Sequence, residues 1–410
     1  MLRPRGHRAD APTPRSPSGC SDPAVTERRV GAGAGGHAWR GGAGAFRSPT
    51  GSVGSPPVKT APTPAASADD VAAAGGPVAA RGLWSLVGRT PLIELRYRLD
   101  GREGRVFAKN EQGNFTGSVK DRMAAWILTR AYATGAIRPG DTIAEATSGN
   151  TGISFAALGR ALGHPVRIYM PDWMSRERVD LIRAFGAEIV PVSREQGGFL
   201  GSIAMCEAYA REHEHVFLPR QFENPANPEA HEKTTAPEIA RQLAALGRTP
   251  DAVVAGVGTG GTIMGLARAL RRRFPAMKAH PLEPADSPTL RTGHKVGKHR
   301  IQGISDEFVP AVVKLPELDD IVDVRDGDAI LMAQALSRRL GLGVGISSGA
   351  NVIGAVQRAT AMGPDAVVVT LLCDSNKKYL STDLCREEPV RPDDWTPRIE
   401  LLSFHAHPDA

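Results

Sequence analysis

Residues 251–274 read DAVVAGVGTGGTIMGLARALRRRF, a buried-looking strand that passes through a glycine turn into an amphipathic helix. This strand–turn–helix order recurs from about residue 80 onward, where short apolar runs alternate with helical periods. The alternation predicts an α/β fold with helices on both faces of a mostly parallel sheet. Further expected strands lie at 141–146, 165–171, 187–192, 215–220 and 366–373, and further helices at 153–162, 175–186, 202–213, 231–247, 328–341 and 350–363.

The charge of the chain is concentrated at its start. The chain has 410 residues and a formal net charge of +6, and residues 1–68 alone hold nine basic and three acidic residues. The rest is therefore neutral overall, and the basic balance indicates nothing about nucleic acid. The same segment is rich in Gly, Ala, Pro and Ser, so we expect residues 1–78 to be disordered.

The four cysteines are Cys20, Cys206, Cys373 and Cys385, and none forms a CxxC pair. We therefore expect reduced thiols in a cytoplasmic protein. Neither a secretory signal nor a run long enough to span a bilayer is visible. No metal site is expected, because the sequence 231–235, HEKTT, lacks the second histidine of a zinc protease motif.

A lysine stands at an expected helix start in the sequence 113–128, GNFTGSVKDRMAAWIL. Ser118 is a plausible N-cap, and Lys120 falls in the first turn, where a cation opposes the helix dipole. A lone lysine in such a place is usually a solvated surface residue.

The glycine turn at 258–262, GTGGT, suits an anion, because backbone N–H groups and a helix N-terminus converge there. It allows two interpretations. Gly256, Gly258 and Gly261 also spell the dinucleotide fingerprint, and Glu283 follows at the expected distance, so a nicotinamide dehydrogenase is a competing hypothesis.

Two more polar junctions between strand and helix favour the other interpretation. The sequence 146–154, ATSGNTGIS, places Thr147, Ser148, Asn150 and Thr151 among two glycines, and 345–351, GISSGAN, offers two serines. A dehydrogenase leaves Lys120 and Asn150 without a role. A lysine that forms a Schiff base with pyridoxal phosphate uses all of these elements.

Seven motifs occur in a family's order: TGSVKDR, TSGNTGI, QFENPANP, GTGGT, EPADSP, HRIQGI and GISSGA. Over roughly residues 80–385 the chain resembles the cysteine synthase (O-acetylserine sulfhydrylase) and cystathionine β-synthase family of fold-type II pyridoxal phosphate enzymes. The resemblance implies a two-domain, tryptophan synthase β-like fold in which each domain is a mostly parallel sheet flanked by helices. It implies an N-terminal domain at 114–222, a C-terminal domain made of 82–113 and 223–390, and a tail at 391–410.

The resemblance also assigns roles. Lys120 would carry the cofactor as a Schiff base and act as the catalytic residue, Asn150 would bond the ring hydroxyl, and Ser347 would face the pyridine nitrogen. A neutral serine there leaves the nitrogen unprotonated, which favours β-elimination through an aminoacrylate. The phosphate would be held by Gly258, Thr259, Gly260, Gly261 and Thr262, and the substrate carboxylate by Thr147, Ser148, Thr151 and Gln221.

The implied reaction is β-replacement that makes L-cysteine from O-acetylserine, or a related activated serine, and sulfide. The sequence 303–308, GISDEF, departs from the family's glycine-rich segment, so Asp306 and Glu307 leave the acceptor open between sulfide and a larger thiol such as homocysteine. Cystathionine formation and cysteine desulfhydration are the alternatives within this chemistry. A catalytically idle protein that binds serine acetyltransferase is the alternative outside it. A homodimer is expected, with serine acetyltransferase as a further partner and without nucleic acid or membrane.

Overall fold

The computed structural model describes residues 79–409. The strands are β1 (Leu92–Leu99), β2 (Arg102–Asn110), β3 (Thr142–Ala146), β4 (Val166–Pro171), β5 (Glu188–Val192), β6 (Val216–Phe217), β7 (Ala252–Gly256), β8 (Lys278–Pro284), β9 (Val322–Val324), β10 (Val368–Leu372) and β11 (Ile399–His407). The α-helices are α2 (Ala79–Trp84), α3 (Lys120–Ala133), α4 (Asn150–Ala161), α5 (Arg176–Ala184), α6 (Gly198–Glu212), α7 (Ala226–Ala230), α8 (Ala236–Ala245), α9 (Gly261–Arg273), α10 (Thr289–Thr292), α11 (Asp326–Leu340) and α12 (Ile346–Met362). A π-helical turn, η2 (His231–Thr235), joins α7 to α8, and 3-10 turns lie at η1 (Glu111–Gly113), η3 (Leu315–Glu317), η4 (Asn376–Lys378), η5 (Asp383–Cys385) and η6 (Thr396–Arg398).

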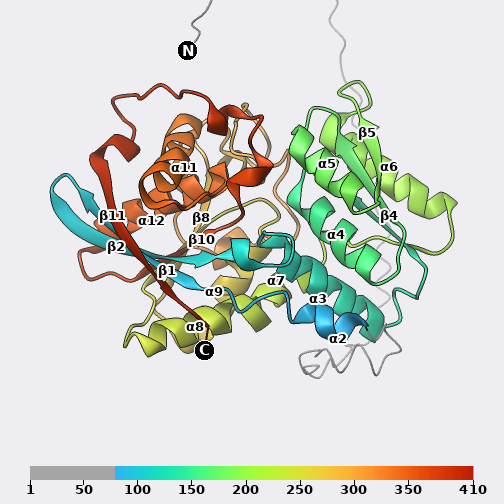
Figure 1. The fold of residues 1–410 in the computed structure, drawn as a ribbon, viewed down its shortest axis with the longest axis horizontal. Helices are drawn as coiled ribbons and strands as arrows, with labels where there is room; N and C mark the ends of the chain where they lie inside the picture. The colour runs from blue at the N-terminus through green and yellow to red at the C-terminus, as the bar shows by residue number, and fades with distance from the viewer. Residues whose placement is uncertain (1–78, 410) are drawn as a thin grey trace, which may run out of the picture. The chain divides into compact units, whose positions relative to one another are not determined.

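These strands form two sheets. The larger has seven strands in the order β11-β1-β2-β10-β7-β8-β9, and the smaller has four in the order β5-β4-β3-β6. All pairs in the smaller sheet are parallel, and only β1 pairs antiparallel in the larger one, with β2 and β11. The predicted α/β fold with two mostly parallel, helix-flanked sheets is confirmed (Figure 1).

The larger sheet is buried on both faces because successive side chains of a strand point to opposite sides. On β2, Val106 and Ala108 pack with residues of α11 and α12, whereas Phe107 packs with residues of α8 and α9. Figure 1 shows α11 and α12 on the side of the sheet opposite α8 and α9. Two helix layers therefore enclose this sheet.

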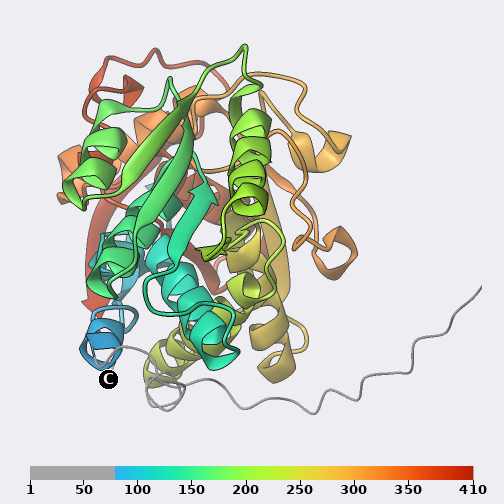
Figure 2. The ribbon, with the colours of Figure 1, turned by 90° about the vertical axis from the view of Figure 1, so that its right-hand side faces the viewer.

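The smaller sheet repeats the plan. Ile143 and Ile168 pack with residues of α3, α4 and α5, whereas Ala144 and Tyr169 pack with Cys206 of α6 on the other face. Figure 2 turns this sheet toward the viewer. Its strands come from 142–217, within the segment expected to form the N-terminal domain. In chain order these strands follow β2 and precede β7 of the larger sheet.

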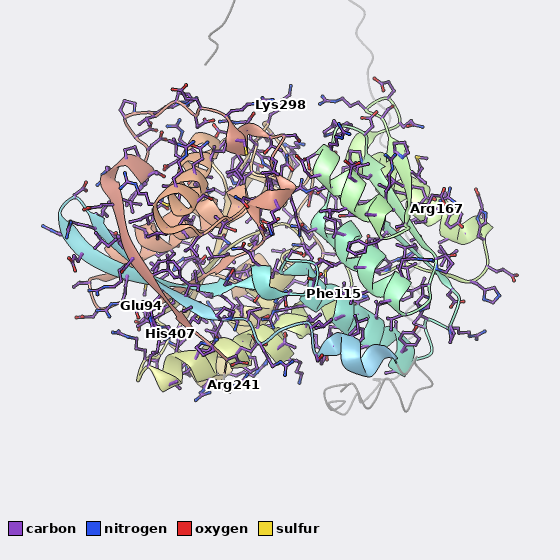
Figure 3. The ribbon with its side chains drawn as sticks, in the orientation of Figure 1. Glu94, Phe115, Arg167, Arg241, Lys298 and His407 are labelled. Atoms are coloured by element: carbon purple, nitrogen blue, oxygen red, sulfur yellow. The ribbon has the colours of Figure 1, made fainter. Side chains whose placement is uncertain are left out.

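The end of the chain differs from the sequence-based expectation. Residues 391–410 were expected to be a tail, but β11 pairs with β1 over its whole length and forms an edge of the larger sheet. Ile399 and Leu401 enter the core cluster of α11 and α12. Figure 3 shows His407 of β11 beside Glu94 of β1, with 3.6 Å between His407 Nε2 and Glu94 Oε2. The segment belongs to the sheet because the alternating Ile399 and Leu401 are buried and the backbone pairs with β1.

The expectation of disorder for residues 1–78 lies outside the described residues. Within 79–409, no helix has both the length and the apolar character needed to cross a bilayer. In the same range Cys206, Cys373 and Cys385 are free thiols.

Candidate active site

A single pocket collects most of the residues singled out in the sequence. It lies where β3, β7 and β10 end, the position at which parallel sheets bind ligands. Of the predicted set, Lys120, Thr147, Ser148, Asn150, Thr151, Gln221, Gly258, Thr259, Thr262 and Ser347 line it. Gly260 and Gly261 belong to the same turn as Gly258 but lie outside the pocket lining.

Lys120 is the first residue of α3. The expected N-cap is wrong: Val119 takes that position without a side-chain hydrogen bond, and Ser118 is fully buried, its hydroxyl unpartnered within the described residues. The turn is held instead by Asp121, which accepts from the Thr116 amide at 2.7 Å and from the Ser154 hydroxyl at 2.6 Å. Because Asp121 is the second residue of the helix, its carboxylate also suits the helix dipole.

A buried ionic cluster surrounds Arg122, two residues after the lysine in α3. Arg122 donates from Nε to Glu111 at 2.5 Å and from Nη1 to Glu238 at 2.8 Å, and Lys109 Nζ lies 2.8 Å from the same Glu238. Burial alone would raise the pKa of Glu238, but hydrogen bonds and charge from Arg122 outweigh it and lower that pKa to about 2. The cluster connects α3 to β2 and α8, and no motif in the sequence indicates it.

The loop after β3 is built around hydroxyls and one amide. Thr147 Oγ1 accepts from the Gly149 amide at 3.0 Å, Thr151 Oγ1 donates to Gln221 Oε1 at 2.6 Å, and Gln221 Nε2 donates to the Ala146 carbonyl at 2.9 Å. These side chains stand at the N-terminus of α4, where backbone N–H groups are free to bind a carboxylate. The loop and Gln221, predicted as one carboxylate site, are thus hydrogen-bonded to each other.

The three glycine positions of the turn 258–262 have no room for a side chain. Gly260 has φ +83°, and a Cβ at Gly258 would lie 2.3 Å from the Gly303 carbonyl oxygen, while one at Gly261 would lie 1.9 Å from Asn227 Oδ1. Asn227 Nδ2 also donates to Thr259 Oγ1 at 2.9 Å. The turn leads directly into α9, so it presents bare backbone amides to an anion.

His231 supports this turn from η2. Its Nε2 lies 3.2 Å from Thr262 Oγ1, and its Nδ1 lies 2.8 Å from Thr235 Oγ1. Burial lowers the pKa of His231 to about 3, so the imidazole is neutral and adds no charge beside the anion site. π-helical turns are rare and concentrate at functional sites, which fits this placement.

Ser347 stands in the first turn of α12 and lines the same pocket as the glycine turn. Cys373 is hydrogen-bonded to its side chain and also accepts from Asn351 Nδ2 at 3.3 Å. Burial raises the pKa of the Cys373 thiol to about 12, so the group stays neutral. Cys373 therefore adds no charge beside Ser347.

Asp306 and Glu307 take different directions. Asp306 lines the pocket, and burial raises its pKa to about 6 despite the opposing charge of Lys120. Glu307 pairs with Lys295 at 3.6 Å outside the pocket lining. Asp306 and Glu307 were the two carboxylates for which the sequence left the identity of the sulfur acceptor open. Only Asp306 lines the pocket where such a substrate would bind.

Together these residues fit pyridoxal phosphate: a lysine amine, a glycine-rich turn that suits an anion and a neutral serine share one pocket. The dinucleotide hypothesis fails at Glu283. That carboxylate is fully buried and accepts from the Leu290 amide at 2.6 Å and from Arg291 at 3.2 Å, which leaves it unavailable to a ribose.

Comparison with known proteins agrees. Residues 83–374 match the family model of the pyridoxal-phosphate dependent enzymes. The chain is 42% identical over 300 residues to the Bacillus subtilis protein named "Probable cysteine synthase", covering 73% of this chain and 96% of that one. It is 54% identical to a hydrogen sulfide-producing enzyme of Fusobacterium nucleatum, Fn1055, with a TM-score of 0.77, covering 79% of this chain and 96% of that one. A variant of Fn1055 has been solved with an α-aminoacrylate intermediate.

The chain therefore belongs to the cysteine synthase family of pyridoxal-phosphate dependent enzymes. The expected family and cofactor are confirmed, and the nicotinamide hypothesis is excluded. The individual roles of the site residues stay predictions.

Sequence reasoning missed several residues around the site. Arg178 of α5 lines the pocket, is nearly fully buried, bonds Gln302 and lies 4.8 Å over the ring of Tyr379. Asp374 and Lys378 contact Asn150. The only signal available for the last two was their position just after β10, where pocket residues of parallel sheets gather.

Proposed function

We propose that the protein catalyses elimination at the β-carbon of a substituted alanine, through an aminoacrylate, in the chemistry that makes or breaks the carbon–sulfur bond of L-cysteine. The observation that carries this proposal is the shared pocket of Lys120, the carboxylate loop and the neutral Ser347. Pyridoxal phosphate, when bound, supplies the electron sink for loss of the α-proton.

In this proposal each residue has one task. Lys120 holds the cofactor and moves the α-proton at its Nζ. Thr147, Ser148, Thr151 and Gln221 bind the substrate carboxylate, and Asn150 bonds the cofactor's ring oxygen. The turn 258–262 binds the phosphate, and Ser347 bonds the ring nitrogen.

Asp306 favours release of sulfide from L-cysteine over its capture. A carboxylate in the pocket repels an incoming hydrosulfide anion by about 1 kcal/mol or more. Below about pH 6, where its raised pKa keeps this carboxyl group protonated, it also holds a proton that it can give to departing sulfur. The 54% identity to a hydrogen sulfide-producing enzyme supports the same direction.

Synthesis of L-cysteine from O-acetylserine, or a related activated serine, and sulfide is the second candidate. The names of the curated relatives at 41–42% identity support it. Both candidates begin with elimination of a group from the β-carbon. They differ in that group: it is the sulfur of L-cysteine in the first candidate and the leaving oxygen of the activated serine in the second.

The deciding experiment compares both directions on the purified holoenzyme. Sulfide and pyruvate release from L-cysteine is measured beside cysteine formation from O-acetylserine, O-phosphoserine or serine with sulfide. Homocysteine replaces sulfide in a parallel series. We expect the higher kcat/KM for L-cysteine; a value more than about tenfold higher for synthesis selects the second candidate. Inactivity in every arm, with no visible cofactor absorbance, would indicate an idle partner protein.

The cytoplasmic location, the homodimer and a serine acetyltransferase partner stay predictions. Sedimentation of the purified protein, alone and mixed with a serine acetyltransferase, tests the last two.

A further inference from the structure

The side chain of Asn150 is held between two buried charged residues. Its Nδ2 donates to Asp374 Oδ2 at 2.7 Å, and its Oδ1 accepts from Lys378 Nζ at 2.9 Å. Asp374 is 0% and Lys378 4% exposed. Because a carboxylate only accepts and an ammonium only donates, the amide has one allowed orientation.

The two charged residues are themselves fixed to the loop that carries Lys120. Asp374 forms an isolated antiparallel bridge with Ser118, and Lys378 Nζ donates to the Gly117 carbonyl at 3.3 Å. Tyr379 donates its hydroxyl to Asp374 Oδ2 at 2.8 Å. The segment after β10 thus connects the loop before Lys120 to Asn150, which follows β3 of the smaller sheet.

The burial of Asp374 and Lys378 destabilises the fold, so a stabilising role does not explain their presence. Burial lowers the pKa of Lys378, although the charges of Asp374 and Asp121 oppose that effect. The buried Asp374 Oδ1 has no hydrogen-bond partner among the described residues. Buried charges with unsatisfied atoms destabilise a fold, and they concentrate at functional sites.

We infer that Asp374 and Lys378 are positioning residues that orient Asn150 toward the cofactor. One Nδ2 hydrogen is committed to Asp374, which leaves the second available to the ring oxygen of pyridoxal phosphate. Without the two charges the amide is free to rotate, and its oxygen would then oppose the lone pairs of that ring oxygen. This inference rests on the proposed contact between Asn150 and the cofactor.

The test compares Lys378→Met with Lys377→Met, the same change at the exposed neighbouring lysine of η4. The measurements are the dissociation constant of pyridoxal phosphate and the relative heights of the visible absorbance bands of the bound cofactor. We expect Lys378→Met to weaken binding on the order of fivefold or more and to change the band ratio. Lys377→Met should change neither.

Asn150→Ala and the double variant Lys378→Met/Asn150→Ala complete a cycle. If Lys378 acts through Asn150, the double variant binds cofactor as Asn150→Ala does, within about twofold. Additive losses, or an unchanged spectrum in Lys378→Met, overturn the inference while the role of Asn150 stands. An unchanged Asn150→Ala variant instead refutes the underlying site assignment. If circular dichroism shows that Lys378→Met does not fold, Asp374→Ala replaces it in the same cycle, with the same expected and contrary outcomes.

Discussion

At the scale of single residues, Lys120 has a position that packing alone does not explain. It begins α3, where a positive charge opposes the helix dipole, yet it lines the pocket between the two sheets. A lysine joined to a cofactor as an imine has given up that charge in part. The helix start therefore suits the proposed role better than it suits a free ammonium.

Lys120→Ala should lower kcat/KM by about a hundredfold to ten-thousandfold or more, because it removes the group that moves the α-proton. The variant should still bind pyridoxal phosphate through the turn 258–262. Steady-state rates and the absorbance spectrum of the dialysed protein measure the two effects. Turnover within tenfold of wild type would remove Lys120 from the proposed mechanism.

Asp306 and Glu307 form a natural pair of test and control, since one faces the pocket and the other pairs with Lys295. Asp306→Asn should change the ratio of kcat/KM values for sulfide capture and sulfide release by more than about threefold, and Glu307→Gln should not. The effect should appear above pH 6, because the pKa of Asp306 is raised to about 6 and the carboxylate is charged only above it. An equal ratio in all three proteins across pH 5 to 8 would show that this carboxylate does not select the sulfur substrate.

At the scale of elements, β11 shows how an edge strand escapes sequence reading. Its inner face carries Ile399 and Leu401, but Phe404 and His405 are exposed, so the apolar alternation covers only its first half. Its pairing partner β1 lies some 300 residues earlier in the chain. Nothing local in 391–410 indicates that contact.

Leu401→Ala should lower the free energy of unfolding by about 2–4 kcal/mol, because it leaves a cavity in the core cluster. Phe404→Ala, at a side chain that is 40% exposed, is the matched control on the same strand and should cost less than about 1 kcal/mol. Urea denaturation of both variants measures the difference. Similar, small losses would mean that β11 contributes little to the sheet.

Glu145 on β3 makes the stability of the smaller sheet depend on pH. Burial raises its pKa to about 8, so the folded protein keeps a proton that the unfolded chain releases above about pH 4.5. The stability from this group is complete below pH 4.5 and is lost as pH rises through about 8. Its carboxyl accepts from the Ala146 amide at 3.0 Å and the Gln221 amide at 3.4 Å, next to the carboxylate loop.

The melting temperature should therefore fall between pH 5 and pH 8 in the wild type, and Glu145→Gln should flatten that fall. Glu207→Gln, at a more exposed carboxylate of α6, should keep the wild-type slope. Differential scanning calorimetry over this range gives the comparison. Parallel slopes in all three proteins would show that Glu145 is not the titrating group.

At the scale of the whole molecule, the sequence predicted what repeats locally. The alternation of strands and helices gave the fold class, and the three polar junctions gave most of the pocket. It did not predict the partners that hold those junctions, such as Asp374 and Lys378 on Asn150, because they come from more than 220 residues away. The predicted N-cap at Ser118 was wrong for a related reason, because the backbone of Ser118 forms a β-bridge with the distant Asp374.

Removal of residues 1–78 should leave folding and turnover unchanged, because their composition supports no core. A chain that begins at Ala79 retains α2, whose Leu83 packs in the core of the smaller sheet. Thermal melting and kcat/KM of the shortened and full chains provide the test. Insoluble protein, or activity below about half of the full chain, would assign the segment a role.

The central place of β10 has a consequence for synthesis on the ribosome. β10 separates β1 and β2 from β7, β8 and β9 in the larger sheet, yet it is made after all of them. Until residue 372 has left the exit tunnel, β2 and β7 each lack the partner strand that joins the two parts of the sheet. Such open strand edges promote association with other chains. Ser347 and Cys373 join the pocket at the same late moment. Nascent chains halted before β10 should thus depend on chaperones and bind no cofactor, and completed chains should bind it as soon as they are released.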